Sequence, residues 1–261
     1  MGSKEDEARN VETWMFRYPG ERFSLFVCIV LTLIVGAIFS YLNIFVVVGL
    51  AVMALIYVRL NQAQYMGNAI RVHTSQFPEL WDIFKDHAER LEIGKGSLFI
   101  KQDPSLNAYT LGVNYCTVIL TSALVEQLTT EELSFVIGHE LGHFKANHTK
   151  ISTLINPLGG GNVFADLIFG FWSRKTEYSC DRCGLILTKD FNSALSSMIK
   201  LSLGGKLINK FDMDGYLEQV RKADSSSVMM GEWLIDHPLT TNRVKKLYTF
   251  WRESFKQKHE V

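Results

Sequence analysis

Hydrophobic residues form one long run near the N-terminus and several shorter periodic stretches after it. The long run extends from Phe23 to Val58, 36 residues without a charged side chain, between Arg22 and Arg59. A single transmembrane helix needs about 20 residues, so this run is long enough for two spans. Because residues 40–43 (Ser-Tyr-Leu-Asn) interrupt it, the pattern predicts an N-terminal hairpin of two transmembrane helices. A helical pair buried inside a soluble domain is the alternative.

The run divides the chain into a polar tail (1–22), a transmembrane hairpin (23–60) and a larger domain (61–261). Arginines lie on both sides of the hairpin, and its connecting turn has none. By the positive-inside rule, both ends of the hairpin and the domain after it face the cytoplasm. We therefore expect an integral membrane protein, with the lipid bilayer as a partner and the bacterial inner membrane as its location.

The domain after the hairpin mixes helical and strand periodicity. A capping-box pattern, Thr129-x-x-Glu132, marks the start of one helix. The other predicted elements are a helix over 77–91, strands over 97–101 and 115–122, and a helix over about 174–187. This mixture predicts an α+β domain.

Composition narrows the possible partners. The 27 basic and 27 acidic residues cancel, and no basic tract interleaves with aromatic residues, so we expect no nucleic acid partner. The four cysteines form no disulfide framework, which favours a reducing compartment. Cys180 and Cys183 have the C-x-x-C spacing of redox and metal sites. With no second pair, two thiols packed in the core are the favoured interpretation.

The segment from His139 to His143 reads His-Glu-Leu-Gly-His, within the helix that begins after Thr129. The spacing i, i+4 places both imidazoles on one helix face, as two ligands of one zinc ion require. Glu140 is offset by about 100° and can reach a water on the metal. The alternative is a pair of structural helix histidines.

A zinc hydrolase needs a third protein ligand and an open fourth position. Glu177 and Asp181, again at i, i+4, supply the candidates, after 33 residues that follow His143. Glu177 would bind zinc, and Asp181 would accept the second N–H of a ligand histidine. Taken alone, two acids on a helix are more often a solvated face.

These motifs, together with the segment His-Pro-Leu-Thr-Thr-Asn-Arg at 237–243, resemble the HtpX and CAAX prenyl protease family of membrane metallopeptidases. The similarity runs from about Asn107 to Arg243. It implies a gluzincin-type fold and one zinc ion per chain. The 33 residues between the two metal motifs are too short for the further hairpin of larger members.

The resemblance also assigns roles. The implied zinc ligands are His139, His143 and Glu177, with Glu140 as general base and acid and Asp181 behind a ligand histidine. His237 is implied to stabilise the oxyanion, and Arg243 to support the site. An extended peptide would add as a strand beside Asn107, Ala108 and Tyr109. His148 is interpreted as an ordinary histidine at a helix end.

These features predict a membrane-anchored zinc endopeptidase that cleaves membrane-associated or misfolded proteins. Zinc would activate the attacking water, and Glu140 would take its proton. Two alternatives stay open. One is a membrane chaperone or assembly factor that keeps the fold, and the other is a zinc hydrolase of a non-peptide substrate. The oligomeric state is left open as well.

Overall fold

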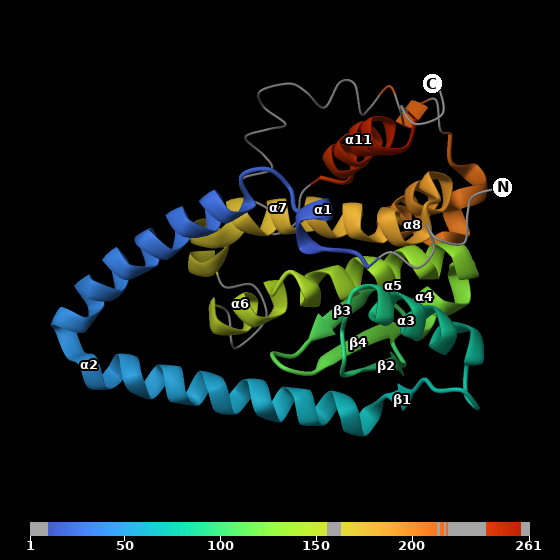
Figure 1. Cartoon of the computed structure of the whole chain (residues 1–261). Helices are drawn as coiled ribbons and strands as arrows, with labels where there is room; N and C mark the ends of the chain where they lie inside the picture. The colour runs from blue at the N-terminus through green and yellow to red at the C-terminus, as the bar shows by residue number, and fades with distance from the viewer. Residues whose placement is uncertain (1–9, 156–162, 213–214, 217, 219–238, 257–261) are drawn as a thin grey trace.

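The computed structural model describes residues 10–155, 163–212, 215–216, 218 and 239–256 (Figure 1). It is rich in helices around one small sheet. The α-helices are α1 (Thr13–Phe16), α2 (Glu21–Asn68), α3 (Pro78–Arg90), α4 (Ser122–Gln127), α5 (Thr130–Lys145), α6 (His148–Ile155), α7 (Val163–Thr188), α8 (Phe191–Leu203) and α11 (Thr240–Trp251). The strands are β1 (Ile70–Arg71), β2 (Gly96–Lys101), β3 (Ala108–Leu111) and β4 (Cys116–Thr121). A 3₁₀-helix covers Gly205–Lys210, and a π-helical turn at Arg252–Lys256 follows α11.

The sheet has the order β1-β2-β4-β3. Its two central strands, β2 and β4, are parallel, with Leu98 opposite Val118. The outer strand β3 is antiparallel to β4 and places Thr110 opposite Val118. Strand β3 lies beside α5, and the Thr110 hydroxyl donates a hydrogen bond to the backbone carbonyl of Glu140. The outer strand β3 is therefore next to the helix that carries the histidine motif.

The main core lies between the sheet, α5 and α7. Fully buried members come from each of these elements, among them Leu98, Val118, Leu120, Ile137, Leu141 and Leu185. Helix α5 begins as the sequence predicts, since Thr129 and Glu132 form both hydrogen bonds of a capping box. Glu132 also pairs with Lys200 of α8 at 2.8 Å, which ties the start of α5 to its neighbour.

Helices α5 and α7 approach each other closely at glycines. A Cβ atom on Gly142 would lie 2.9 Å from the Cβ of Cys183, and one on Gly184 would lie 2.8 Å from the carbonyl oxygen of Phe135. Real Cβ atoms do not approach so closely, so the absence of side chains at both positions allows this packing. The close approach brings the histidines of α5 next to the acids of α7.

The α+β mixture and the predicted elements of the domain are confirmed, with bounds shifted by a few residues. One helix is much longer than predicted: α7 begins at Val163, where the sequence indicated a start near 174. Its first half packs against α2 in a small second core of Cys28, Phe169 and Trp172. Helix α7 therefore connects the N-terminal helix to the histidine motif.

Helix α2 differs from the expected hairpin. It is one continuous helix from Glu21 to Asn68, which Figure 1 shows bent near its middle, and residues 40–43 are helical. None of these four residues is glycine or proline, so nothing in them forces a turn. The hairpin is not confirmed, and the division at 23–60 stays a prediction.

Within the described ranges, one segment is long and apolar enough to cross a membrane, the first part of α2 from Glu21 to Ile38. Only 17% of this segment is buried. Large apolar side chains on it are exposed, among them Phe23, Phe26, Leu33 and Ile34. A contiguous apolar surface of this kind is typical of contact with lipid or with another protein.

Candidate metal centre

Three side chains from two helices meet at the α5–α7 interface. The Nε2 atoms of His139 and His143 are 3.2 Å apart. Oxygens of Glu177 lie 3.5 Å from Nε2 of His139 and 3.3 Å from Nε2 of His143. Ligands at about 2.1 Å from a tetrahedral zinc ion are about 3.4 Å apart. The three donors therefore have the spacing that one zinc-sized ion needs.

Asp181 contacts the edge of the His139 ring that faces away from His143 and Glu177. Nδ1 of His139 donates to Oδ1 of Asp181 at 3.0 Å, which leaves Nε2 as the free lone pair facing His143 and Glu177. Burial alone would lower the pKa of His139, but hydrogen bonds and charges from Asp181 and Glu177 raise it to about 10. The acids therefore attract a cation at this imidazole, either a proton or a metal ion.

Arg243 of α11 contacts both acids of the cluster. Its Nε and Nη2 atoms donate to the two oxygens of Asp181 at 2.9 and 2.6 Å. Its Nη1 atom lies 3.4 Å from Glu177. Burial would raise the pKa of Glu177, but hydrogen bonds from the two histidines and the charge of Arg243 lower it well below its usual value. Both acids are thus held as carboxylates.

Glu140 faces the sheet. Its Oε2 accepts a hydrogen bond of 2.8 Å from the hydroxyl of Thr110 on β3, and its own residue's carbonyl accepts from the same hydroxyl at 3.0 Å. The carboxylate is buried, follows His139 directly in the sequence and is oriented by the outer strand. Sequence reasoning missed Thr110, because no local pattern relates it to Glu140.

His148 is another residue that the sequence interpretation undervalued. It begins α6, but it is fully buried, and its Nε2 donates to Glu21 at 3.2 Å. Burial lowers the pKa of His148 to about 4, so its imidazole is neutral. Its Nδ1 lies 3.5 Å from the sulfur of Cys180. Glu21 is 127 residues away in sequence, so no spacing could have indicated this contact.

The remaining predicted residues fall in two groups. Ala108 and Tyr109 lie on β3, directly after Asn107, whose backbone N–H donates to the Thr121 hydroxyl at 3.1 Å. The segment therefore lies at the outer strand beside α5, and its role in binding a peptide stays a prediction. His237 lies outside the described residues. Cys180 and Cys183 are buried free thiols, as predicted.

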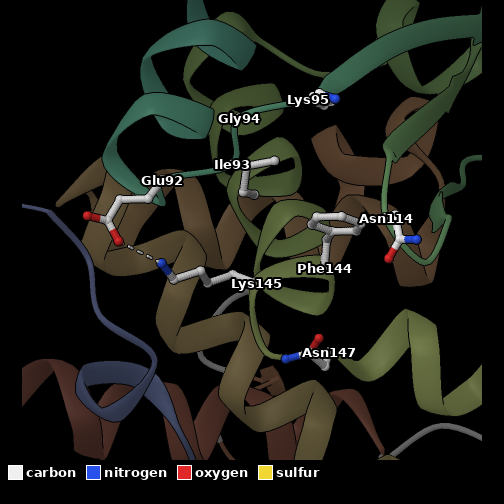
Figure 2. Close-up of a pocket in the computed structure, with 8 residues that line it drawn as sticks. All are labelled: Glu92, Ile93, Gly94, Lys95, Asn114, Phe144, Lys145 and Asn147. Carbon is white, nitrogen blue, oxygen red and sulfur yellow. Dashed lines mark hydrogen bonds and ion pairs between the residues drawn. The ribbon is translucent and has the colours of Figure 1, made fainter.

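A cavity of about 330 Å³ lies near the C-terminal end of α5 (Figure 2). Lys145 spans part of it and pairs with Glu92 at 3.2 Å. The lining residues are Glu92, Ile93, Gly94, Lys95, Asn114, Phe144, Lys145 and Asn147. This lining includes neither the two motif histidines nor Glu177, so the cavity does not mark the site of the metal chemistry.

A buried histidine, a half-buried histidine one turn further along the same helix, an acid from a second helix and a carboxylate beside them are typical of metallopeptidases. The chain belongs to peptidase family M48, whose family model matches residues 74–160 and 158–250. The resemblance to the HtpX family is thereby confirmed. Membership in this family supports a metallopeptidase role.

Individual proteins that are similar to this chain are also named as metallopeptidases or proteases. The chain is 30% identical over 215 residues to plastoglobule-localized metallopeptidase 48, chloroplastic, of Arabidopsis thaliana, covering 74% of this chain and 62% of that protein. It is 25% identical over 268 residues to a protease HtpX homolog of Streptococcus uberis, covering 84% and 85%. A protease HtpX homolog of Levilactobacillus brevis is 34% identical over 138 residues, covering 48% and 46%. The chain thus spans less than two thirds of the plant relative and of the Levilactobacillus one.

Proposed function

We propose that this chain is a zinc endopeptidase anchored in a membrane, with residues 61–261 as a gluzincin-type catalytic domain. The observation that carries the proposal is the convergence of His139, His143 and Glu177 at 3.2 to 3.5 Å. Two nitrogens and one carboxylate are the donor set of catalytic zinc sites that keep one position open. When bound, zinc supplies Lewis-acid polarisation of the scissile carbonyl and activation of water.

The surrounding residues position this ligand set. Asp181 fixes the tautomer of His139, and the positive charge of Arg243 offsets part of the negative charge of Asp181 and Glu177. Such partners keep the ligands oriented before the metal binds, which raises metal affinity.

Glu140 acts as the general base and then as the general acid. It takes a proton from the attacking water and delivers it to the leaving nitrogen. The hydrogen bond from Thr110 holds one oxygen of its carboxylate, so the other is available for the proton. His237 stabilises the developing oxyanion. This role is supported by its position six residues before Arg243, which contacts both Asp181 and Glu177.

The substrate is an extended polypeptide. Strand β3 is the last strand of the sheet order and lies beside α5, so a peptide that adds along Asn107, Ala108 and Tyr109 would pass Glu140. An outer strand beside the metal ligands favours a peptide substrate over a small non-peptide one.

The membrane anchor is formed by α2. The exposed apolar side chains of Glu21–Ile38 support insertion into a bilayer. With arginines on both sides of the apolar run, the catalytic domain faces the cytoplasm, where it cleaves membrane-associated or misfolded proteins.

The test is cleavage of an unfolded protein such as casein by the full chain in detergent, with and without added zinc. Glu140→Gln should lower the rate by roughly two orders of magnitude or more, because an amide cannot take the proton. The matched control is Glu131→Gln, an exposed acid on the same helix, which should cleave like the wild type. Equal rates for Glu140→Gln and Glu131→Gln would reject the proposal.

The same samples separate the two alternatives. A chaperone would suppress aggregation of the unfolded protein without producing fragments, and Glu140→Gln would do so equally well. A hydrolase of non-peptide substrates would leave casein intact but turn over a small ester.

A further inference from the structure

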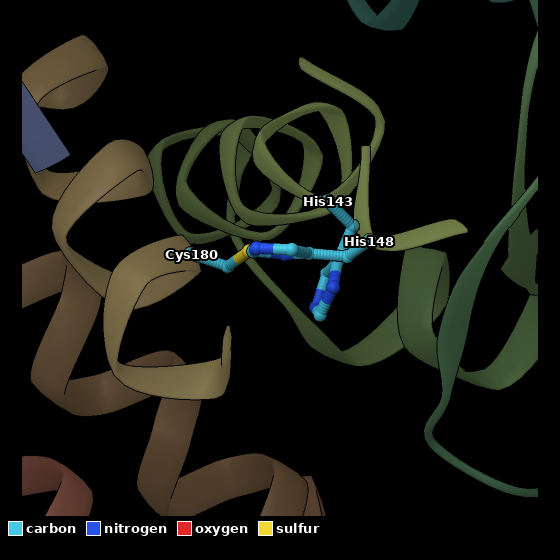
Figure 3. A group of neighbouring side chains, drawn as sticks. All are labelled: His143, His148 and Cys180. Atoms are coloured by element: carbon cyan, nitrogen blue, oxygen red, sulfur yellow. The ribbon is translucent and has the colours of Figure 1, made fainter. Parts of the chain in front are cut away.

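Three side chains from three helices converge on one side of the α5–α7 interface: His143, His148 and Cys180 (Figure 3). Each offers a nitrogen or sulfur donor, and these donor atoms all lie within 4.8 Å of one another. His143 also belongs to the group with His139 and Glu177. The metallopeptidase reaction assigns no task to His148 or Cys180.

The spacing of these donors suits a metal ion. Sγ of Cys180 and Nδ1 of His148 are 3.5 Å apart. In a tetrahedral zinc site, a sulfur at about 2.3 Å and a nitrogen at about 2.1 Å are separated by about 3.6 Å. Cys180 and His148 are 0% and 2% exposed, so both donors are shielded from competing water.

Glu21 gives His148 the orientation of a metal ligand. Nε2 of His148 donates to the Glu21 carboxylate at 3.2 Å, which directs the other nitrogen toward Cys180. Glu21 is itself 1% exposed and accepts hydrogen bonds from Arg17 and Ser179. Ligand histidines in proteins nearly always donate their other ring N–H to a carboxylate, a backbone carbonyl or water. The pair Glu21–His148 thus repeats the arrangement of Asp181–His139.

We propose that His143, His148 and Cys180 form a second site for a transition-metal cation of the zinc class. Cys180 binds as the thiolate, so metal uptake releases the thiol proton to solvent. A thiolate with two imidazoles selects zinc, cobalt or copper over calcium and magnesium. Because His143 serves both groups of donors, filling this second site with excess metal disturbs the first and slows peptide cleavage.

The experiment titrates the metal-free full chain in detergent with cobalt(II) chloride. A cobalt–thiolate bond produces a charge-transfer band in the near ultraviolet, which nitrogen and oxygen ligands do not produce. We expect the band in the wild type and its complete loss in Cys180→Ser and Cys180→Ala. Cys183→Ser is the matched control, because Cys183 is a buried thiol on the same helix that packs against Gly142, and it should keep the band.

Two further arms keep the result decisive. Glu177→Ala removes a donor of the first group only, so it should lose peptide cleavage yet retain the band. X-ray absorption of the cobalt-loaded wild type should detect a sulfur neighbour and needs no variant. Absence of both the band and the sulfur neighbour in the wild type would overturn the proposal, as would a band that persists in Cys180→Ser and Cys180→Ala. Neither result would bear on the catalytic role of Glu140.

Discussion

Helices α5 and α2 are both rich in apolar residues but have opposite surroundings. In α5, ten residues are buried, Glu132, Leu133 and the continuous stretch from Phe135 to Gly142. In the first part of α2, most large apolar side chains are exposed, and a Cβ atom on Gly36 would meet nothing within 4 Å. The corresponding atom on Gly142 would meet Cys183 at 2.9 Å.

The difference shows what an apolar helix needs in order to become part of the buried core around the candidate metal centre. Helix α5 interleaves apolar residues with glycines and with the polar residues His139, Glu140 and His143, and each of these finds a partner. The apolar run of α2 carries no charged group between Phe23 and Val58. Its apolar surface therefore suits lipid, which selects for hydrophobicity and not for shape.

The same substitution in both helices should produce the largest contrast. Ile137→Asp places a charge at a position that is 0% exposed, and burying an unpaired charge costs more than the whole stability of many domains. Ile34 is 54% exposed, so Ile34→Asp should leave the domain folded and weaken membrane retention, by about 3 kcal/mol if the residue sits at the bilayer centre.

Thermal melting and carbonate extraction of membranes measure the two effects. Ile137→Asp should show no cooperative melting. Ile34→Asp should melt like the wild type but be released by carbonate to a greater extent. If Ile34→Asp melts as poorly as Ile137→Asp, then α2 is packed inside the fold and the comparison is wrong.

Metal removal should have the next largest effect. It should destabilise the packing of α5 against α7 and leave α2 unaffected. A bound ion stabilises the folded state by about 4 kcal/mol when the free metal is about 1,000 times its dissociation constant. A chelator should therefore lower the melting temperature of the wild type but leave the protein in the membrane. Glu177→Ala is the control and should respond less to the chelator, because it keeps only the donors of the group His143, His148 and Cys180. An equal response in both would mean that the stabilising ion is bound elsewhere.

Two glycines provide a finer test. Gly142→Val should cost about 1–3 kcal/mol by overpacking against Cys183 and should separate the histidines from Glu177. Gly36→Val should have no measurable cost, because its surroundings are open. Melting temperature and zinc content of both variants check this. A tolerated Gly142→Val would show that α5 and α7 can move apart without loss of the site.

Local patterns predicted much of this structure. Helical and strand periodicity predicted α3, β2, β4 and α5, and the capping box at Thr129 predicted where α5 begins. The pattern Glu177-x-x-x-Asp181 placed two acids on one helix face, and the helix is present. These features depend on interactions within a few residues, which a sequence shows directly.

Long-range contacts could not be predicted in the same way. The hydrogen bond between Glu21 and His148 joins residues 127 positions apart. The hydrogen bond between Thr110 and Glu140 joins residues 30 positions apart. They arise only once α5, α7 and the sheet have packed together. The continuity of α2 was missed for a related reason, since a polar interruption in an apolar run is compatible with a turn and with a helix.

The smallest expected effect concerns Thr110, which joins the outer strand to the buried polar side of α5. Its hydroxyl donates to Oε2 of Glu140 at 2.8 Å. Thr110→Val keeps the shape of the side chain and removes the donor, and hydrogen bonds to charged groups contribute about 1.5–3 kcal/mol. Because this hydrogen bond orients the proposed general base, which would act in the transition state, kcat should fall about tenfold or more while KM changes little. Thr110→Ser restores the hydroxyl and should recover most of the rate, whereas a mere packing role would be served better by valine.

Peptide-cleavage kinetics of the two variants, at equal zinc content, make the comparison. A rate for Thr110→Val equal to that of the wild type would mean that Glu140 needs no orientation from β3. The functional part of the contrast between α5 and α2 would then rest on the histidines and Glu177 alone.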